Sequence, residues 1–466
     1  MVLRHPLIPW LVLIALAAAF NLVLLGRLPL EDADEATYAM VAREMSENGD
    51  YIVPRIDGAP WVDKPPLYFW LAASSAKIFG ENEFSLRLPS VLAGIAAVVL
   101  TALIVRQLTQ DKESALFSGL VLISLPLFLL ASRNMRLDVP VSTAILAAIY
   151  CFLKGRERPG WFAGVGTAIG IGVLLKSVVG LLALPLILIF SLIYRDWRWL
   201  KNHYFWIGAA LGIAIALPWH LAMEAALDGF FAHYFGFQIG RAAVNILESQ
   251  ITAAYVLWVF FRHGQPWSSL LIAGAAGWLA ARFAGWRRGN PEIARAVWFS
   301  LAAWLFFFGF FLLPKTKLIT YFIPSYPFAA IFLGALYAAI LQTKSRTVFR
   351  AVGRAAIIAA LILSVREAFL DTRLYVTAAS ADEKSIGLTL AGESAGIPIY
   401  LYEFPPDQSI QYYSRRPVRH ISAASGVALA PPFNLIIPTP LIAENKWLNA
   451  FPPLYRGKSL ALYRIE

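Results

Sequence analysis

The stretch Glu31-Asp32-Ala33-Asp34-Glu35 begins a polar segment that closes on Asp63-Lys64-Pro65-Pro66. Apolar runs at residues 7–26 and 88–105 flank this segment. Four carboxylates within five residues stand out in a chain that is 59% hydrophobic and only 15% charged. Such a cluster is costly beside apolar surroundings unless it meets water, a cation or a substrate. We therefore expect the rest of the chain to be organised around this segment.

The apolar runs decide the fold class. The chain of 466 residues has a mean hydropathy of +0.62, and its long runs approach the roughly 20 residues that cross a bilayer core. The first run is long enough to span and lacks an obvious small-x-small cleavage site, so we interpret it as a helix. Two of the runs are short enough to be tilted or re-entrant (161–175 and 178–194). We predict an all-α polytopic membrane domain over residues 1–370, with about eleven transmembrane helices near 7–26, 88–105, 115–132, 139–153, 161–175, 178–194, 204–222, 267–284, 296–313, 320–341 and 353–370.

The net charge of +11 reflects membrane topology rather than nucleic-acid binding. Most Lys and Arg residues fall in short loops between apolar runs, as the positive-inside rule predicts for the cytoplasmic side. The single cysteine, Cys151, lies in an apolar run, which excludes a disulfide framework and a thiolate metal site. The outer side then carries residues 31–87, 133–138, Lys176, 223–266, 314–317 and everything after 370.

Local patterns predict the elements outside the membrane. Asp32 and Glu35 have the spacing of a capping box, and apolar residues then repeat at helical spacing as far as Asn48-Gly49. This pattern predicts a short amphipathic helix on the outer membrane surface. Asp57-Gly58 is a turn signal, and Leu67–Phe79 predicts a second helix. After about residue 375, short apolar runs predict strands in a small extracytoplasmic α/β domain over 371–466, at Ile399–Phe404, Asn434–Ile437 and Ser459–Ile465.

Ionisable residues gather at the predicted outer rim. Each alone has a structural explanation, as a solvated helix start, a surface ion pair, a helix cap or a lysine that snorkels to headgroups. At the edge of a bilayer core each costs about 2.5–3.5 kcal/mol, and a shared water-filled cavity lowers that cost. A carboxylate there can take a proton from an attacking group, and cations can stabilise a departing phosphate. We therefore predict group transfer from a lipid phosphate, by a set that includes Asp34, Glu35, Asp63, Lys64, Asp138, Lys176, His263, Lys315, Lys317 and Tyr321.

Longer motifs run through most of residues 5–345. They are Asp34-Glu35-Ala36-Thr37-Tyr38, Ala42-Arg43-Glu44-Met45, Gly49-Asp50-Tyr51-Ile52-Val53-Pro54-Arg55, Asp63-Lys64-Pro65-Pro66-Leu67 with Trp70-Leu71, Arg87-Leu88-Pro89-Ser90, Arg136-Leu137-Asp138, Leu175-Lys176-Ser177, Gln265-Pro266-Trp267, and Lys317-Leu318-Ile319-Thr320-Tyr321 with Pro324. In these motifs the chain resembles the aminoarabinose transferase and protein O-mannosyltransferase-like family of polyprenyl-phosphate-dependent membrane glycosyltransferases, which have the GT-C fold. The first-loop motifs are the most specific.

The resemblance implies an inverting glycosyltransferase of the bacterial cytoplasmic membrane, with its active site on the periplasmic or outer face. It implies a donor sugar on undecaprenyl phosphate and a lipid A, glycan or protein acceptor. We also expect the enzyme to be a monomer. Asp34, with Glu35 beside it, would be the catalytic base. The donor phosphate would be held by Lys64, Tyr38, Arg55, Lys176, Lys317 and Tyr321. A divalent metal, whether zinc, magnesium or manganese, would be held by Asp63, Asp138 and His263.

Three positions depart from the family pattern. Asp63 stands where Glu is common, which shortens the reach to a metal. Thr37 stands where Arg is frequent, and Ile319 replaces a usual Pro. The first two departures leave metal binding and the donor open.

Two other classes of function remain as alternatives. A transporter or flippase for lipid-linked glycans is expected to carry charges near the membrane midplane and inverted repeats. Here the charges cluster at one rim and no internal repeat is visible. A scaffold whose C-terminal domain binds a partner would tolerate the change Asp34→Asn, whereas the enzyme would not.

Overall fold

A computed structural model describes residues 7–30, 34–243, 251–284, 290–343, 346–366, 378–393, 396–404, 408–422 and 429–466. Glu31 and Asp32 of the acidic stretch, and the domain boundary predicted at 370/371, lie outside the described residues. The chain forms two compact units. The first comprises residues 1–23, 62–68 and 88–370, and the second comprises residues 24–61, 69–87 and 371–466. Most of the first loop thus groups with the C-terminal residues, which the sequence pattern did not indicate.

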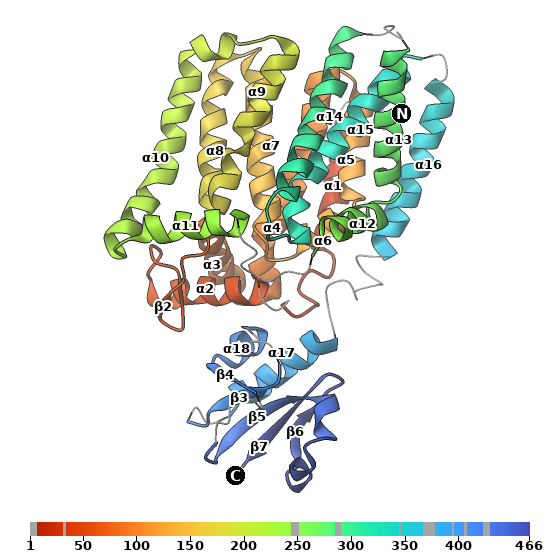
Figure 1. Cartoon of the computed structure of the whole chain (residues 1–466). Helices are drawn as coiled ribbons and strands as arrows, with labels where there is room; N and C mark the ends of the chain where they lie inside the picture. The colour runs from red at the N-terminus through yellow and green to blue at the C-terminus, as the bar shows by residue number, and fades with distance from the viewer. Residues whose placement is uncertain are drawn as a thin grey trace. The chain divides into compact units, whose positions relative to one another are not determined.

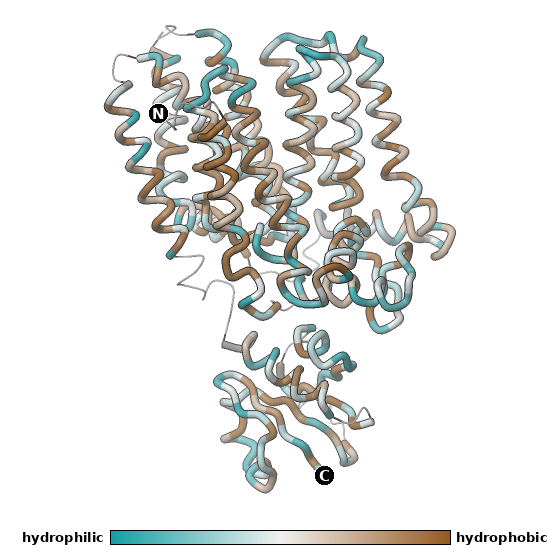
Figure 2. The backbone as a smooth tube through the Cα atoms, turned by 180° about the vertical axis from the view of Figure 1, so that it is seen from behind, coloured by the Kyte–Doolittle hydropathy of each residue, from teal (hydrophilic) through white to brown (hydrophobic). Residues whose placement is uncertain are grey.

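The first unit is a bundle of apolar helices whose polar loops lie at the two ends (Figures 1 and 2). Among the described residues, seven helices are long and apolar enough to cross a membrane. An eighth is added if a pair bent by 67°, α5 and α6, forms one span. The helices of this bundle are α1 (Ile8–Leu22), α4 (Glu83–Thr109), α5 (Lys112–Ile123), α6 (Pro126–Arg133), α7 (Asp138–Gly155), α8 (Ala163–Lys176), α9 (Ala183–Tyr194), α10 (His203–Ala226), α11 (Phe230–Ala243), α12 (Ala253–His263), α13 (Trp267–Phe283), α14 (Pro291–Leu312), α15 (Ser325–Leu341) and α16 (Arg346–Val365).

The fold class predicted from the sequence is confirmed, and the number of crossings is approximate. Ten of the eleven predicted spans each overlap one of these helices, and the span predicted at 115–132 corresponds to the bent pair of α5 and α6. However, α1 has 15 residues and α13 has 17, so each is shorter than a full crossing. In addition, α8 and α9 belong to one apolar stretch of 36 residues. The protein is therefore a helical multi-pass membrane protein.

Four glycines bring α8 and α10 into backbone contact. A Cβ atom added at Gly166 would lie 2.0 Å from the Gly208 carbonyl oxygen, and one at Gly170 would lie 2.5 Å from that of Gly212. Gly166 and Gly170 are four residues apart, as are Gly208 and Gly212, which is the small-xxx-small pattern of closely packed membrane helices. The sequence therefore fixes this helix pair at a distance that no larger side chain permits.

The first-loop part of the second unit begins with α2 (Asp34–Asn48), followed by a hairpin of β1 (Arg55–Ile56) and β2 (Ala59–Pro60), and then α3 (Leu67–Phe79). The predicted helices over these residues are confirmed. The turn residues Asp57 and Gly58 both have positive φ, +53° and +77°, as two-residue hairpin turns require. Most of α2 is buried, including Glu35 at its start, so it is not a helix that only rests on a surface.

Among its described residues, the C-terminal part of the second unit is a five-stranded mixed sheet with two α-helices, α17 (Ala378–Ala391) and α18 (Gln408–Ser414). The strand order is β4-β3-β5-β7-β6. Alternate residues of β5 and β7 enter two separate hydrophobic clusters, so both faces of the central strands are covered. The strands are β3 (Ile399–Tyr402), β4 (Val418–Ile421), β5 (Phe433–Pro438), β6 (Pro453–Arg456) and β7 (Leu460–Ile465).

Candidate active site

The residues predicted for the site divide between the two units. The second unit holds four of them: Asp34, Glu35, Tyr38 and Arg55. The first unit holds the other seven: Asp63, Lys64, Asp138, Lys176, His263, Lys317 and Tyr321. The contacts of these residues are defined within each unit, and the convergence of all eleven residues stays a prediction.

Asp138 and Lys176 form the central ion pair of the first unit. Asp138 is the first residue of α7 and Lys176 is the last residue of α8, so two neighbouring helices present them at the same end. Lys176 Nζ lies 2.5 Å from Asp138 Oδ1, and the side chains are 15% and 7% exposed. The same ammonium lies 5.2 Å from the centre of the Tyr321 ring, a cation–π distance. The structure thus brings together three of the predicted residues, from distant parts of the sequence.

Ser177 ends α8 in a strained backbone conformation. Its φ of +50° is rare for a residue other than glycine, and the chain continues as a short 3-10 helix, η3 (Ser177–Leu182), into α9. Gly172 on α8 and Gly180 on η3 nearly touch, because a Cβ at Gly172 would lie 3.0 Å from the Gly180 Cα. The chain therefore turns back sharply beside Lys176. Strained backbone of this kind concentrates at functional sites.

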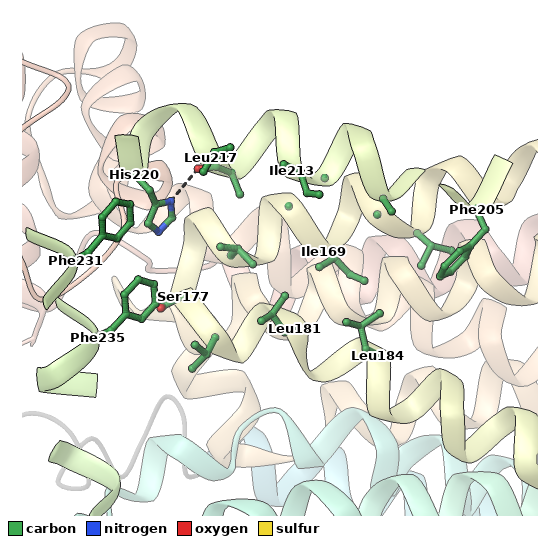
Figure 3. A pocket seen from close by; sticks show the side chains of 18 residues that line it. Ile169, Ser177, Leu181, Leu184, Phe205, Ile213, Leu217, His220, Phe231 and Phe235 are labelled. Atoms are coloured by element: carbon green, nitrogen blue, oxygen red, sulfur yellow. Dashed lines mark hydrogen bonds between the residues drawn. The ribbon is translucent and has the colours of Figure 1, made fainter. Parts of the chain in front are cut away.

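An apolar groove begins at this turn. It has a volume of about 430 Å³ and runs between α8, η3, α10 and α11. Figure 3 shows Ser177 and His220 at one end, with Phe231 and Phe235 nearby, and Phe205 at the other end. The His220 Nδ1 atom donates a hydrogen bond to the Ala216 carbonyl oxygen, 2.8 Å away, which orients the ring. The groove is thus apolar along its length and polar at the end next to Lys176.

A second ion pair of the first unit joins Asp63 and Lys64, which are neighbours in the sequence. Lys64 Nζ lies 2.6 Å from Asp63 Oδ2, and Lys64 is only 8% exposed. The fully buried Tyr234 of α11 lies within electrostatic reach of Asp63 and faces Ser177, and its ring centre is 6.1 Å from that of His220. α11, which the sequence had not singled out, therefore joins the Asp63 region to the polar end of the groove.

Each residue predicted as a metal ligand has another contact in the structure. Among the described residues, no group of three His, Cys, Asp or Glu side chains has the geometry to hold a metal ion. Asp63 pairs with Lys64 and Asp138 pairs with Lys176, and His263, at the end of α12, lies against Trp258. Two of the three predicted ligands are thus engaged by lysines.

The other predicted phosphate ligands have local partners. Lys317 Nζ donates to the Pro314 carbonyl oxygen at 2.6 Å. Arg55 donates to the Gly58 carbonyl oxygen at 3.1 Å and so closes the β1–β2 hairpin. Tyr38 is 4% exposed and packs against Trp61 and Phe69 with ring-centre distances of 6.0 and 5.6 Å. Arg55 and Tyr38 therefore have evident structural roles in the first loop.

Glu35 is an anchor of α2. Its carboxylate is fully buried and accepts two hydrogen bonds from Arg87, from Nε at 2.9 Å and from Nη2 at 2.7 Å. The same guanidinium donates to the carbonyl oxygens of Leu25, Leu28 and Pro29. This geometry suits a fixed ion pair better than the proton acceptor predicted at Glu35. The neighbouring Asp34, the first residue of α2, is half-buried.

Glu81 gives the second unit a pH dependence that can be measured. Burial would raise the pKa of Glu81, but the charge of Arg43, 2.6 Å away, and a hydrogen bond from Tyr412 hold this pKa below its ordinary value. A carboxylate whose pKa is lower in the folded than in the unfolded protein stabilises the folded state at pH values above the unfolded-state pKa. This stabilisation is lost as the pH falls through the folded-state pKa. We expect the thermal midpoint to drop between about pH 5 and pH 3, and to drop less in Glu81→Gln. If the thermal midpoint fell equally with pH in the wild type and in Glu81→Gln, the role given to Glu81 would be contradicted.

The sequence did not point to three polar residues near the groove or the first loop, which are His220, Tyr234 and Tyr413. It also did not indicate the role of Arg87. His220 and Tyr234 lie in apolar helical stretches, where a polar residue reads as an isolated exception. Arg87 offered a signal, because an arginine stands at the start of a long apolar run. Tyr413 offered none, because the hydrogen-bond partners of its hydroxyl lie more than 300 residues away in the sequence.

Comparisons with known proteins match most of the chain. A family profile described as dolichyl-phosphate-mannose-protein mannosyltransferase matches residues 63–221. The undecaprenyl phosphate-alpha-4-amino-4-deoxy-L-arabinose arabinosyl transferase of Pseudomonas paraeruginosa is 28% identical over 406 residues, which cover 85% of this chain and 72% of that protein. The protein of the same description from an Enterobacter species is 29% identical over 348 residues, covering 72% and 61%.

Solved structures agree on the fold. The crystal structure of ArnT from Cupriavidus metallidurans bound to undecaprenyl phosphate matches with a TM-score of 0.74 at 18% identity, over 99% of this chain and 98% of that one. The oligosaccharyltransferase of Archaeoglobus fulgidus matches with a TM-score of 0.59 at 13% identity, over 90% and 65%. The family profile and the sequence relatives identify the chain as a membrane glycosyltransferase similar to the aminoarabinose transferases and protein O-mannosyltransferases, and the solved structures show that it has the fold of ArnT.

Proposed function

We propose that this glycosyltransferase moves a sugar from undecaprenyl phosphate to an acceptor on the outer, periplasmic face of the bacterial cytoplasmic membrane. The relatives from Pseudomonas and Enterobacter are named for 4-amino-4-deoxy-L-arabinose on that lipid, and the solved relative holds undecaprenyl phosphate. We take the same aminopentose as the sugar and lipid A as the acceptor.

The groove of the first unit is the observation that carries this proposal. A polyprenyl chain needs an apolar surface that extends from the membrane edge toward the bilayer interior. The groove from Ser177 to Phe205 follows α8 and α10, two helices of a membrane bundle, and aliphatic side chains and glycines form most of its lining. Burial of isoprene units against such a lining contributes about 25 cal/mol per Å² of apolar surface.

The polar end of the groove fits the phosphate. Lys176, next to Ser177, supplies a cation, and Asp138 holds that cation in place. Once a donor phosphate is present, the ammonium can bridge it and the carboxylate, and so stabilise the charge that grows on the phosphate as the sugar leaves. Lys64, whose side chain is buried beside Asp63, is the second cation that we assign to the phosphate.

Asp34 is the base in this proposal. The acceptor oxygen attacks the anomeric carbon of the sugar, and its proton passes to the Asp34 carboxylate. The bond between the anomeric carbon and the phosphate oxygen breaks, with its electron pair remaining on the lipid phosphate. Because a phosphate is a good leaving group, no general acid is required. Attack from the side opposite the phosphate inverts the anomeric centre.

Sugar transfer from a purified undecaprenyl phosphate aminoarabinose donor to lipid A tests the function directly. The full chain is reconstituted in nanodiscs, and modified lipid A is measured by mass spectrometry. Formation of the product with release of undecaprenyl phosphate supports the proposal. Transfer to another glycan but not to lipid A would overturn the acceptor alone, and movement of the intact donor across a vesicle membrane without transfer would favour a flippase.

A tryptophan in the groove is expected to impair donor binding. Ile213 lies midway along the α10 wall in Figure 3. The larger ring of Ile213→Trp fills the space of isoprene units, so we expect the KM for a long-chain donor to rise about tenfold, equivalent to roughly 1.4 kcal/mol. A donor with a much shorter tail is expected to be affected less.

The matched control is Leu211→Trp on the same helix. Leu211 is 44% exposed and Ile213 is 59% exposed, but only Ile213 lines the groove. Leu211→Trp should therefore leave the KM unchanged. Equal KM values for the two variants would exclude the groove as the tail site.

A further inference from the structure

The hydroxyl group of Tyr413 joins the C-terminal helices to the start of the first loop. The backbone N–H of Leu30 donates to Tyr413 Oη at 2.8 Å, and the hydroxyl donates to Glu83 Oε1, also at 2.8 Å. Lys384 of α17 lies 2.5 Å from the same Glu83 oxygen. One phenol thus fixes a backbone position four residues before Asp34, within the second unit.

The phenol keeps its proton in this position. Burial, and then the negative charge of Glu83, raise the pKa of Tyr413 far above its ordinary value. Both hydrogen bonds of the hydroxyl are therefore present throughout the physiological pH range. The residues that meet Tyr413 come from three separate segments: Leu30, Glu83 and Lys384.

Tyr412, the preceding residue, holds the middle of α2. The Arg43 guanidinium lies 3.9 Å above the Tyr412 ring and donates to the Tyr412 carbonyl oxygen at 2.8 Å. Arg43 also pairs with Glu81, and the Tyr412 hydroxyl donates to that same carboxylate at 2.9 Å. Consecutive tyrosines of α18 therefore contact the chain before α2 and the body of α2.

The sheet domain fixes α18 itself. Ile410 of α18 is fully buried in a hydrophobic cluster with Ile386 of α17 and Leu401 of β3. Gly387 permits close packing, because a Cβ there would lie 2.5 Å from the Tyr413 Cβ. The position of Tyr413 is thus determined by the folded sheet and passed to the loop through its hydroxyl.

We propose that the C-terminal domain is a positioning element for α2, and that Tyr413 and Tyr412 are positioning residues that set where Asp34 stands. This assigns a role in the reaction to the sheet domain, which carries none of the predicted catalytic residues. The proposal rests on the function given above for Asp34. It predicts that loss of one hydroxyl in the C-terminal domain slows the chemical step without weakening donor binding.

The test is Tyr413→Phe in the full chain, reconstituted in nanodiscs with undecaprenyl phosphate aminoarabinose and lipid A. We expect kcat to fall about fivefold, because one hydrogen bond contributes roughly a kcal/mol to a defined geometry. The KM for the donor should not change, since the donor groove contains no residue of this unit. Glu83→Gln, which keeps an acceptor for the hydroxyl, should retain more activity than Glu83→Ala.

Tyr455→Phe is the matched control. The Tyr455 hydroxyl donates to Asp382 Oδ1 at 2.8 Å, so the variant loses a hydrogen bond of the same length to a carboxylate. That bond lies inside the C-terminal part and does not reach the first loop. Tyr455→Phe should keep the wild-type kcat, and an equal loss in both variants would overturn the proposal in favour of general destabilisation.

Amide hydrogen exchange separates this proposal from the proposed function. Mass spectrometry of a peptide covering residues 25–40 should show about fivefold faster exchange near Leu30 in Tyr413→Phe, and no change in Tyr455→Phe. If the wild type transfers no sugar, the proposed function fails. The exchange result then still tests whether the Tyr413 hydroxyl holds the chain near Leu30 in place. Unchanged exchange, or faster exchange with an unchanged kcat, would overturn the positioning role.

Discussion

Replacing Asp34 by Asn is expected to lower kcat by about a thousandfold, within the range that a general base contributes. The amide has the size of the carboxylate but cannot accept the proton of the attacking acceptor. Asn also suits the start of a helix, so α2 should form as before. The measurement is sugar transfer in nanodiscs at saturating donor, with elution volume and thermal midpoint recorded in parallel.

Asp50→Asn is the control for this variant. Asp50 lies in the same loop, and its carboxylate accepts hydrogen bonds from the backbone N–H groups of Ile52 and Val53 at 3.0 and 3.1 Å. An Asn side-chain oxygen can accept these bonds as well, so activity should remain near the wild-type value. Wild-type activity in Asp34→Asn would remove Asp34 as the base.

Replacing Arg87 by Ala is expected to destabilise the protein by about 3–5 kcal/mol, the typical result of breaking a buried ion pair on one side. The variant leaves the Glu35 carboxylate, which is fully buried, without its guanidinium partner. It also removes the donor to three carbonyl groups of residues 25–29. Thermal unfolding in detergent measures the loss, and limited proteolysis should detect earlier cleavage of the first loop.

Arg295→Ala is the matched comparison. Arg295 lies 2.6 Å from Glu292, one turn away on α14, and both side chains are about half exposed, at 46% and 55%. Exposed pairs contribute about 0–1 kcal/mol, so this variant should unfold close to the wild type. The double variant Arg87→Met with Glu35→Leu should recover part of the stability that Arg87→Ala loses, because it leaves no buried charge. Similar losses for Arg87→Ala and Arg295→Ala would contradict the account of Glu35.

The sequence was sufficient for elements whose signals are local. The Asp57-Gly58 turn, the helix over Leu67–Phe79 and the central strands β5 and β7 each follow from residues within a few positions of one another. Strands β4 and β6 were missed, because these edge strands are short and polar. In β4, Arg419 and His420 are exposed, so no apolar alternation marks the strand.

For the site, the sequence supplied the residue types and not their partners. Asp138 and Lys176 were both predicted, and their pairing depends on how α7 and α8 pack, across 38 residues. Glu35 looked like part of a solvated acidic run. Its burial depends on Arg87, which lies 52 residues further along the chain. Contacts over such separations carry no local periodicity, so the acidic run and the motif both grouped Glu35 with Asp34.

The backbone contact between α8 and α10 has a consequence for the length of lipid that the protein accepts. With Gly166 and Gly170 against Gly208 and Gly212, the two helices form a floor in direct backbone contact, which can neither move closer together nor tilt into one another without steric clash. The rim of the groove is formed by outward-facing residues such as Val178 and Leu217, so one side stays open to the bilayer. Isoprene units that extend beyond the end of this floor can lie in the surrounding lipid at little cost in free energy. Affinity should therefore rise with tail length only until the floor is covered, and then level off.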